Sequence, residues 1–410
     1  MITNFSITPQ ENKLNVSPAN GGNFQPAKSE READDFRAST GLLVINGGIV
    51  SPPPKKAENG TFERLNRRFR LQDVARKLLP SEAIQGCLRW RYNVTRAVGV
   101  QYVADKKSSH FSNLQTCGLP WVCPVCAAKI SERRRVELRA GVESWKQKGG
   151  IVFLVTLTMQ HKQDEKIKDL LNELNSAYRS LRSGMPWQRF EFKYGLVGSV
   201  ASHEITYSQH NGFHPHKHIL FFSDASLTKK DYLAIEIYLT LRWKKVLSRF
   251  GRSALNGIGV DVQQGYGAVG DYVAKWGLVE EVTKSNSKTG TINSKADHYS
   301  PFQLLDLVAE GSSWAGEVFR EYAKATKYKN QLTWSPGLRL ILGLGIELTD
   351  LEVAELQEKH AVTLIELLFP QWQKVLKLRA RAVLLEVAST GRADLVKIYL
   401  KSVGVLDLLE

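Results

Sequence analysis

The spacing of apolar residues alternates between stretches with a helical period and stretches typical of strands. Residues 62–79 repeat their apolar positions with a helical period, and Pro80 ends the repeat. Residues 87–104 alternate well enough to predict one or two strands. Residues 131–148 predict a basic helix with Ser131 as its N-cap. The first 150 residues therefore predict a mixture of helices and strands.

From residue 151 onward, the order of the segments indicates a fold class. Apolar, β-branched residues run without a break over 151–159, which predicts a buried strand. The patterns that follow predict, in order, a helix over 164–182, strands over 195–207 and 213–222, a helix over 227–250 capped by Thr228, a strand over 257–262 and a helix around 271–276. This β-α-β-β-α-β order predicts an α+β fold with helices on an antiparallel sheet.

Composition divides the chain into five expected parts. Residues 1–60 are rich in Asn, Ser, Pro and Gly without an apolar period, which predicts a largely disordered tail. A region of helix, strands and clustered cysteines at 61–150 precedes the sheet core at 151–285. A helical extension at 286–345 and C-terminal helices at 346–410 complete the chain, so we expect an all-α C-terminal region.

Charge favours nucleic acid as the partner. The 410 residues include 56 Lys and Arg against 41 Asp and Glu, a net charge of +15, which suits a polyanion. The N-terminus lacks the pattern of a secretory signal, and no apolar run is long enough to span a membrane. We therefore expect a cytoplasmic protein without membrane contact, in which clustered thiols are metal ligands before they are disulfides.

The first chemical cluster is His214-Pro-His-Lys-His218. Alternate residues of a strand share a face, so His214, His216 and His218 are expected to project together. Glu204 lies on the preceding strand, where hairpin pairing brings it opposite the histidines, whereas His203 faces the other way. Imidazoles beside a carboxylate suit a divalent ion. The alternative is a partly exposed strand with several satisfied histidines.

A second cluster joins Tyr272 and Lys275, which are one turn apart on the predicted helix. A phenol has a pKa near 10, so tyrosine attacks well only where a cation favours the phenolate. Lys275 could provide that cation or bind a phosphate. Taken alone, such a pair is more often packing and solvation.

Four cysteines form the third cluster. The knuckle of Cys123 and Cys126 is typical of tetrahedral zinc sites, Cys117 adds a third ligand, and Cys87 or His110 could be the fourth. The alternatives are a redox pair, which would need a thioredoxin-like context, or free buried thiols. A structural zinc would stabilise the region before the sheet.

Basic residues near aromatic ones are candidates for contacts with DNA. The run Arg133, Arg134 and Arg135 is expected either to touch the DNA backbone or to form a solvated helix face. The segments Arg89-Trp-Arg-Tyr92 and Arg242-Trp-Lys-Lys245 suit phosphate contact with base stacking, although Trp243 could equally be packed on its helix.

Three segments resemble, in order, motifs one, two and three of plasmid rolling-circle replication initiators. They are residues 153–158, 214–218 and 272–275, and the similarity spans roughly residues 85–345. Those initiators are HUH endonucleases with a single catalytic tyrosine. The resemblance implies an HUH-type nuclease domain, with the histidine segment as its most specific part.

The resemblance also implies roles for single residues. His216 and His218 would hold Mg²⁺ or Mn²⁺, with Glu204 as third ligand and His214 as its competitor. Tyr272 would become joined to the 5′ phosphate at the nick, leaving a 3′ hydroxyl for a host polymerase. A plasmid origin, single-stranded at the nick, is the implied DNA, and a host helicase and a second copy of the chain are candidate partners.

One position departs from the family pattern, and two other functions stay open. Relatives often carry Glu four residues before the tyrosine, where this chain has Ala268, so the way a replication round ends is not explained. An HUH transposase or conjugative relaxase would share the histidines and the tyrosine. A two-tyrosine transposase would need a second tyrosine, and Tyr266 is poorly spaced for one helical face. A non-catalytic, zinc-containing DNA-binding protein is the remaining alternative.

Overall fold

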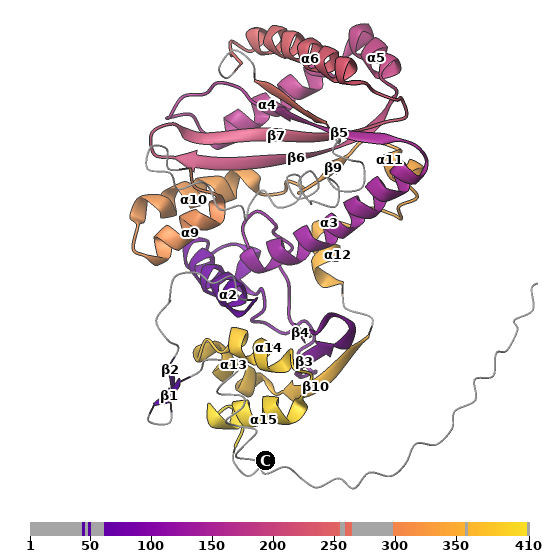
Figure 1. The fold of residues 1–410 in the computed structure, drawn as a ribbon. Helices are drawn as coiled ribbons and strands as arrows, with labels where there is room; N and C mark the ends of the chain where they lie inside the picture. Colours follow the sequence, from indigo (N-terminus) through magenta and orange to yellow (C-terminus); the bar gives the residue numbers. More distant parts are fainter. Residues whose placement is uncertain are drawn as a thin grey trace, which may run out of the picture. The chain divides into compact units, whose positions relative to one another are not determined.

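The computed structural model describes residues 43–45, 48–50, 61–254, 259–264, 298–356 and 360–407. The chain divides into two units, residues 1–58 and 59–410. In the first, strands β1 (Leu43–Ile45) and β2 (Gly48–Val50) pair antiparallel, and the rest of the expected tail lies outside the described residues. The second unit contains two further sheets and the helices α2 to α15 (Figure 1).

A five-stranded antiparallel sheet forms the centre of the second unit. Its order is β8-β5-β7-β6-β9, made of β5 (Ile151–Leu157), β6 (Leu196–Ser208), β7 (Gly212–Ser223), β8 (Val260–Gln264) and β9 (Thr333–Trp334). The described elements run β5, α4, α5, β6, β7, α6, β8 along the chain. The α+β class with antiparallel strands is confirmed, and β9 adds a strand to a region expected to be helical.

Helices α4 (Ile167–Leu181), α5 (Gly184–Lys193) and α6 (Lys229–Arg249) cover one face of this sheet (Figure 1). They pack on Phe153, Val155 and Phe221, which alternate with residues of the other face. Thr228 caps α6 through a capping box, as expected. The sequence pattern did not separate α5 from its surroundings, although its buried Trp187 anchors it to the core.

Helix α3 (Pro124–Gln147) packs on the opposite face, where Leu138 and Val142 meet Leu154 and Phe222. The expected start at Ser131 is wrong. The helix begins seven residues earlier, with Cys123 as N-cap, because Pro124 fits the first helical position and lacks an N–H to satisfy. The cysteine knuckle therefore forms the beginning of this helix.

The remaining elements beside the central sheet are helical. They are α2 (Thr61–Leu78), the short 3₁₀ turn η1 (Ala83–Gln85), α9 (Pro301–Ala309), α10 (Ser313–Thr326), α11 (Leu338–Ile341) and α12 (Asp350–Glu355). A further 3₁₀ turn, η2 (Ala104–Lys106), joins two strands of a second sheet. The expected helix at 62–79 is thus confirmed, and α9 and α10 lie within the expected helical extension at 286–345. None of the described helices combines the length and apolarity that crossing a bilayer requires.

A second antiparallel sheet, of order β10-β3-β4, contains β3 (Val98–Val103), β4 (Ser108–Ser112) and β10 (Ala361–Leu367). Helices α13 (Phe369–Lys377), α14 (Arg381–Ala388) and α15 (Ala393–Ser402) follow β10. The expectation of an all-α C-terminal region is wrong, because residues 361–367 pair with β3. The C-terminal segment therefore completes a sheet that starts before residue 112.

Candidate active site and metal centre

The β6–β7 hairpin gathers histidines and a carboxylate on one face of the central sheet. Its register sets Glu204 opposite His216, Ser202 opposite His218 and Thr206 opposite His214. Directly opposed residues of an antiparallel pair share a face, so Glu204 lies on the side of the three histidines. The pairing expected from the sequence is the pairing observed.

Two contacts hold the ring of His218. Its Nε2 lies 2.9 Å from Glu204 Oε2, and its Nδ1 lies 3.0 Å from Thr156 Oγ1 on β5. The His218 ring is only 2 % exposed. The ring of His216 lies 6.2 Å from that of His218 and 4.5 Å from that of His214, centroid to centroid. Glu204 and His218 are therefore within hydrogen-bond distance of each other on this face of the sheet.

The ligand atoms of Glu204, His216 and His218 are not drawn together as closely as those of a closed metal cage. Among the residues the structure describes, only the cysteine group has three or more ligand atoms within 4.8 Å of one another.

His161 belongs to this cluster and was missed by sequence reasoning. It follows β5, and its Nε2 lies within hydrogen-bond distance of His214 Nδ1. Burial lowers the pKa of His161, and burial with the neighbouring His216 and His161 lowers the pKa of His214 to about 3. Both rings are thus neutral near pH 7. His161 lies three residues after the motif-one segment, and this position is the feature of the sequence that could have identified it.

The opposite face of the hairpin holds a separate polar group. His203 Nε2 and Lys217 Nζ each lie 2.9 Å from Asn175 Oδ1 on α4, and the Lys217 ammonium sits over the Tyr178 ring. Burial and the neighbouring Lys217 hold the pKa of His203 well below its usual range. His203 therefore faces away from Glu204, as the strand period predicted.

All four cysteines converge beside the N-terminus of α3. Cys87 Sγ lies 3.8 Å from Cys123 Sγ and 3.6 Å from Cys126 Sγ, and Cys117 Sγ lies 3.6 Å from Cys126 Sγ. The four side chains are buried, and this group could bind a metal ion. His110, the alternative fourth ligand, lies on β4 outside the group.

Buried cations surround the cysteine group. Arg76 donates to the carbonyl oxygens of Ile84 and Cys87, and its pKa is lowered by burial but raised by Asp73, Cys123 and Cys87. Arg381, from α14, donates to Gln72 and Asp73 on α2. These guanidinium groups would offset negative charge if the four cysteines held a metal ion as thiolates.

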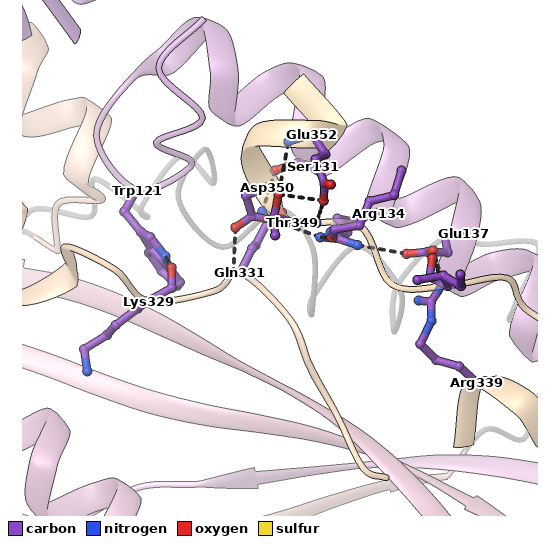
Figure 2. Close-up of polar contacts among 12 residues, drawn as sticks. Trp121, Ser131, Arg134, Glu137, Lys329, Gln331, Arg339, Thr349, Asp350 and Glu352 are labelled. Atoms are coloured by element: carbon purple, nitrogen blue, oxygen red, sulfur yellow. Dashed lines mark hydrogen bonds and ion pairs between the residues drawn. The ribbon is translucent and has the colours of Figure 1, made fainter. Parts of the chain in front are cut away.

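The arginine run on α3 is engaged inside the protein. Arg134 is 4 % exposed and pairs with Asp350 and Glu137 (Figure 2). Arg135 pairs with Glu132. Arg133 is half-buried and donates to the carbonyl oxygen of Leu356. The expectation that this run touches the DNA backbone fails for Arg134 and Arg135, because α12 and the acidic residues of α3 occupy their guanidinium groups.

The two basic and aromatic segments have opposite environments. Trp243 is fully buried and donates from Nε1 to the carbonyl oxygen of Thr158, while Arg242 donates to the carbonyls of Leu181 and Ser183. Trp243 is therefore part of the core, whereas Lys244 and Lys245 are exposed. In the other segment, the side chains of Trp90 and Tyr92 are exposed.

Tyr272 and Lys275 lie outside the described residues, as do Tyr266 and Ala268. The described ends of that segment bracket the histidines along β7. Gln264 is opposite Phe153, which is itself opposite Phe221. At the other end, Tyr299 bridges Tyr207, which is opposite Phe213.

These features define an α+β protein that carries a histidine and carboxylate cluster on its central sheet and a buried four-cysteine group beside it. A family model described as "Replication protein" matches residues 109–342, more than half of the chain, and the chain belongs to this family. The matched residues include β5, β6 and β7 together with three of the four cysteines.

Two curated relatives support the match. The chain is 26 % identical over 298 residues to "Protein rep" of Streptomyces lividans, covering 56 % of this chain and 64 % of the relative. It is 29 % identical over 131 residues to "Neomycin resistance protein" of Streptomyces cyanogenus, covering 26 % of this chain and 30 % of the relative. The chain thus spans less than two thirds of either relative. No solved structure matches.

Proposed function

We propose that this protein initiates rolling-circle replication of a plasmid by nicking one strand of the origin. The observation that carries the proposal is the β6–β7 hairpin, which sets Glu204 against His218 and on the same face as His216. Membership of the replication protein family supports the biological role. The order β5, α4, α5, β6, β7, α6, β8 supports an HUH-type nuclease domain.

The cluster fits a hard or borderline divalent ion such as Mg²⁺ or Mn²⁺. Adjacent ligands of an octahedral ion with bonds of ~2.1 Å are ~3.0 Å apart, close to the 2.9 Å between His218 Nε2 and Glu204 Oε2. A hydrogen bond from Nδ1–H of His218 to Thr156 Oγ1 would leave Nε2 unprotonated, on the side of the carboxylate, as a metal ligand has to be. His216 would complete the set, with His214 held by His161 instead.

The nucleophile we propose is Tyr272. Its phenol oxygen forms a bond to the scissile phosphorus as the bond from phosphorus to the 3′ oxygen breaks. The phenol proton is released to solvent, and the 3′ oxygen takes up a proton and leaves as a hydroxyl. Lys275 favours the phenolate or binds the phosphate. A divalent ion, when bound, polarises the phosphodiester and offsets the charge that develops.

The described residues on either side of the Tyr272 segment pair with the sheet that carries the histidines, which supports Tyr272 as the nucleophile for this cluster. The segment with Tyr272 begins after Gln264, level with Phe221 on β7, and ends at Tyr299, level with Phe213. The free 3′ hydroxyl would be extended by a host polymerase, with a host helicase separating the strands and the origin DNA as substrate.

We also propose that the four cysteines hold a structural zinc ion. Tetrahedral zinc with Zn–S bonds of ~2.3 Å places sulfur atoms ~3.8 Å apart. The Sγ separations of 3.6 and 3.8 Å among Cys87, Cys117, Cys123 and Cys126 suit that geometry. In this proposal Cys87, rather than His110, is the fourth ligand.

Supercoiled plasmid carrying the replicon that encodes this chain provides the test. With Mn²⁺, the protein should convert it to relaxed circles with protein attached at the 5′ end of the nick. Tyr272→Phe should abolish both products, because the phenylalanine ring has no oxygen to attack phosphorus. Tyr266→Phe is the matched control and should nick like the parent. Full activity of Tyr272→Phe would exclude Tyr272 as the nucleophile. Loss of activity in both variants would favour a two-tyrosine enzyme.

A further inference from the structure

An exposed loop of residues 88–97, here called the aromatic loop, is not used by the proposed nicking reaction. The side chains of Trp90 and Tyr92 are 53 % and 76 % exposed, and Val94 is 70 % exposed. Arg89 and Arg96 are exposed as well. Scattered apolar residues are common on a protein surface, but several large ones within five residues mark a binding surface.

Hydrogen bonds hold the aromatic loop in one conformation. The side-chain amide of Asn113 donates to the carbonyl oxygens of Asn93, Arg96 and Ala97. Backbone bonds join Leu88 and Trp90 to Gln115, and Tyr92 to Asn113. Cys87, immediately before the loop, belongs to the buried cysteine group. The aromatic rings are therefore presented on a rigid support, which reduces the entropy lost when a ligand binds.

Helix α13 fixes the loop from its other side. The Arg91 guanidinium lies over the Phe369 ring, 4.6 Å from its centroid, and Trp372 Nε1 donates to the carbonyl oxygen of Arg89. Trp372 itself is fully buried. The C-terminal segment thus positions a surface that lies far from it in the sequence, and this surface exists only when both segments are folded together.

Charge indicates what the aromatic loop binds. Residues 83–104 contain three arginines and no Asp or Glu, so the surface attracts anions. Aromatic faces beside guanidinium groups are the means by which proteins bind single-stranded nucleic acid, since unpaired bases stack and phosphates meet the cations. Duplex DNA hides its base faces and would leave the rings without a partner.

We propose that the aromatic loop binds single-stranded DNA, at a site distinct from the histidine and carboxylate cluster. Trp90 and Tyr92 supply stacking surfaces, and Arg89 and Arg96 contact phosphates. The inference rests on the proposed function only in taking DNA as the ligand. A strand displaced or melted at the origin has the required chemistry: it is polyanionic and its bases are unpaired.

The test measures binding of the full chain to a fluorescent 20-nucleotide DNA strand of mixed sequence, by anisotropy. All variants are made in the Tyr272→Phe background, so that nicking does not enter the result. Stacking contributes about 1–3 kcal/mol per base, so Tyr92→Ala should weaken binding by about fivefold to a hundredfold. Tyr92→Phe should bind like the parent, because it keeps the ring.

Phe192→Ala is the matched control, since Phe192 on α5 is 91 % exposed and lies outside the loop. It should bind normally. Arg89→Ala should reduce the dependence of binding on salt by about one phosphate contact. A duplex of the same sequence should bind more weakly than the single strand. Tyr92→Ala should weaken binding of the duplex less than it weakens binding of the single strand. Unchanged single-strand binding by a folded Trp90→Ala, Tyr92→Ala double variant would overturn the proposal and indicate a protein partner instead.

Discussion

Arg134 on α3 and Asp350 on α12 form an ion pair, with 3.1 Å between Nη2 and Oδ1. Their side chains are 4 % and 10 % exposed. Asp350 also accepts from the backbone N–H of Gln331, and Arg134 donates to the carbonyl oxygen of Leu348 (Figure 2). The pair thus joins the helix that begins at the cysteine group to the chain that follows the central sheet.

Removing Arg134 should destabilise the protein strongly. Arg134→Met leaves the carboxylate of Asp350 buried without its cation, and breaking a buried pair in this way costs about 3 kcal/mol. Urea unfolding measures the loss. Arg133→Met is the control, because Arg133 is half-buried and not in the pair, and it should cost about 0.5 kcal/mol. If both variants lost the same free energy of unfolding, the buried ion pair would not be a major contributor to stability.

Thr156 should act as a positioning residue for His218. Its hydroxyl oxygen lies 3.0 Å from Nδ1, and by accepting a hydrogen bond from Nδ1–H it would fix the ring with an unprotonated Nε2 beside Glu204. Thr156→Val keeps the shape but removes the bond, and affinity for Mn²⁺ should fall about 10–100-fold. Thr156→Ser should restore it. Calorimetric titration with Mn²⁺ measures both, and an unchanged affinity in the valine variant would contradict the role.

Glu204 and His218 should be required for nicking, whereas a histidine nearby in sequence should not. Glu204→Gln and His218→Ala each remove a proposed ligand, and the rate of plasmid relaxation should fall by about a hundredfold or more. His210→Ala is the matched control because His210 is exposed in the turn between β6 and β7. If His210→Ala lost as much activity as His218→Ala, a general loss of hairpin structure would explain both.

A zinc ion bound by the cysteine group should protect all of the thiols in the chain from a thiol reagent. Because the chain has only four cysteines and all lie in this group, a thiol reagent reports on the group alone. We expect one zinc per chain by mass spectrometry of metals and slow reaction of the native protein with the reagent. After a chelator and denaturant, four thiols should react. Rapid reaction of the native protein, without bound zinc, would contradict a structural metal site.

Local patterns predicted the histidine cluster well, because its geometry depends on two adjacent strands. The alternation of His214, His216 and His218 and the short turn to Glu204 set the register without distant contacts. Membership of His161 depended on a loop that folds back to His214, which no period reveals. Sequence therefore predicted the face of the sheet and the residues on it, but only part of the surrounding contacts.

Long-range pairing explains the main errors. Residues 361–367 join β3, more than 250 residues earlier in the chain, so their strand conformation is stabilised by a partner that local pattern does not show. In the same way, Arg134 looked like a solvated or DNA-facing residue because its partner Asp350 lies 216 positions away. The run of arginines identified positive charge but not the acidic residues that meet it.

The C-terminal segment should be indispensable for folding of the unit that contains both candidate sites. A stop after Leu356 removes β10, which leaves the central strand β3 with an open edge, and it removes Arg381, which binds Gln72 and Asp73 beside the cysteines. It also removes Trp372, which is 0 % exposed in the full chain, and so uncovers the surface on which Trp372 packs. We expect the shortened chain to aggregate, or to melt at least about 10 °C lower, because several buried residues are lost at once. A stop after Asp407 is the control and should fold normally; a shortened chain that kept its melting temperature and zinc content would show that residues 360–407 form an independent part.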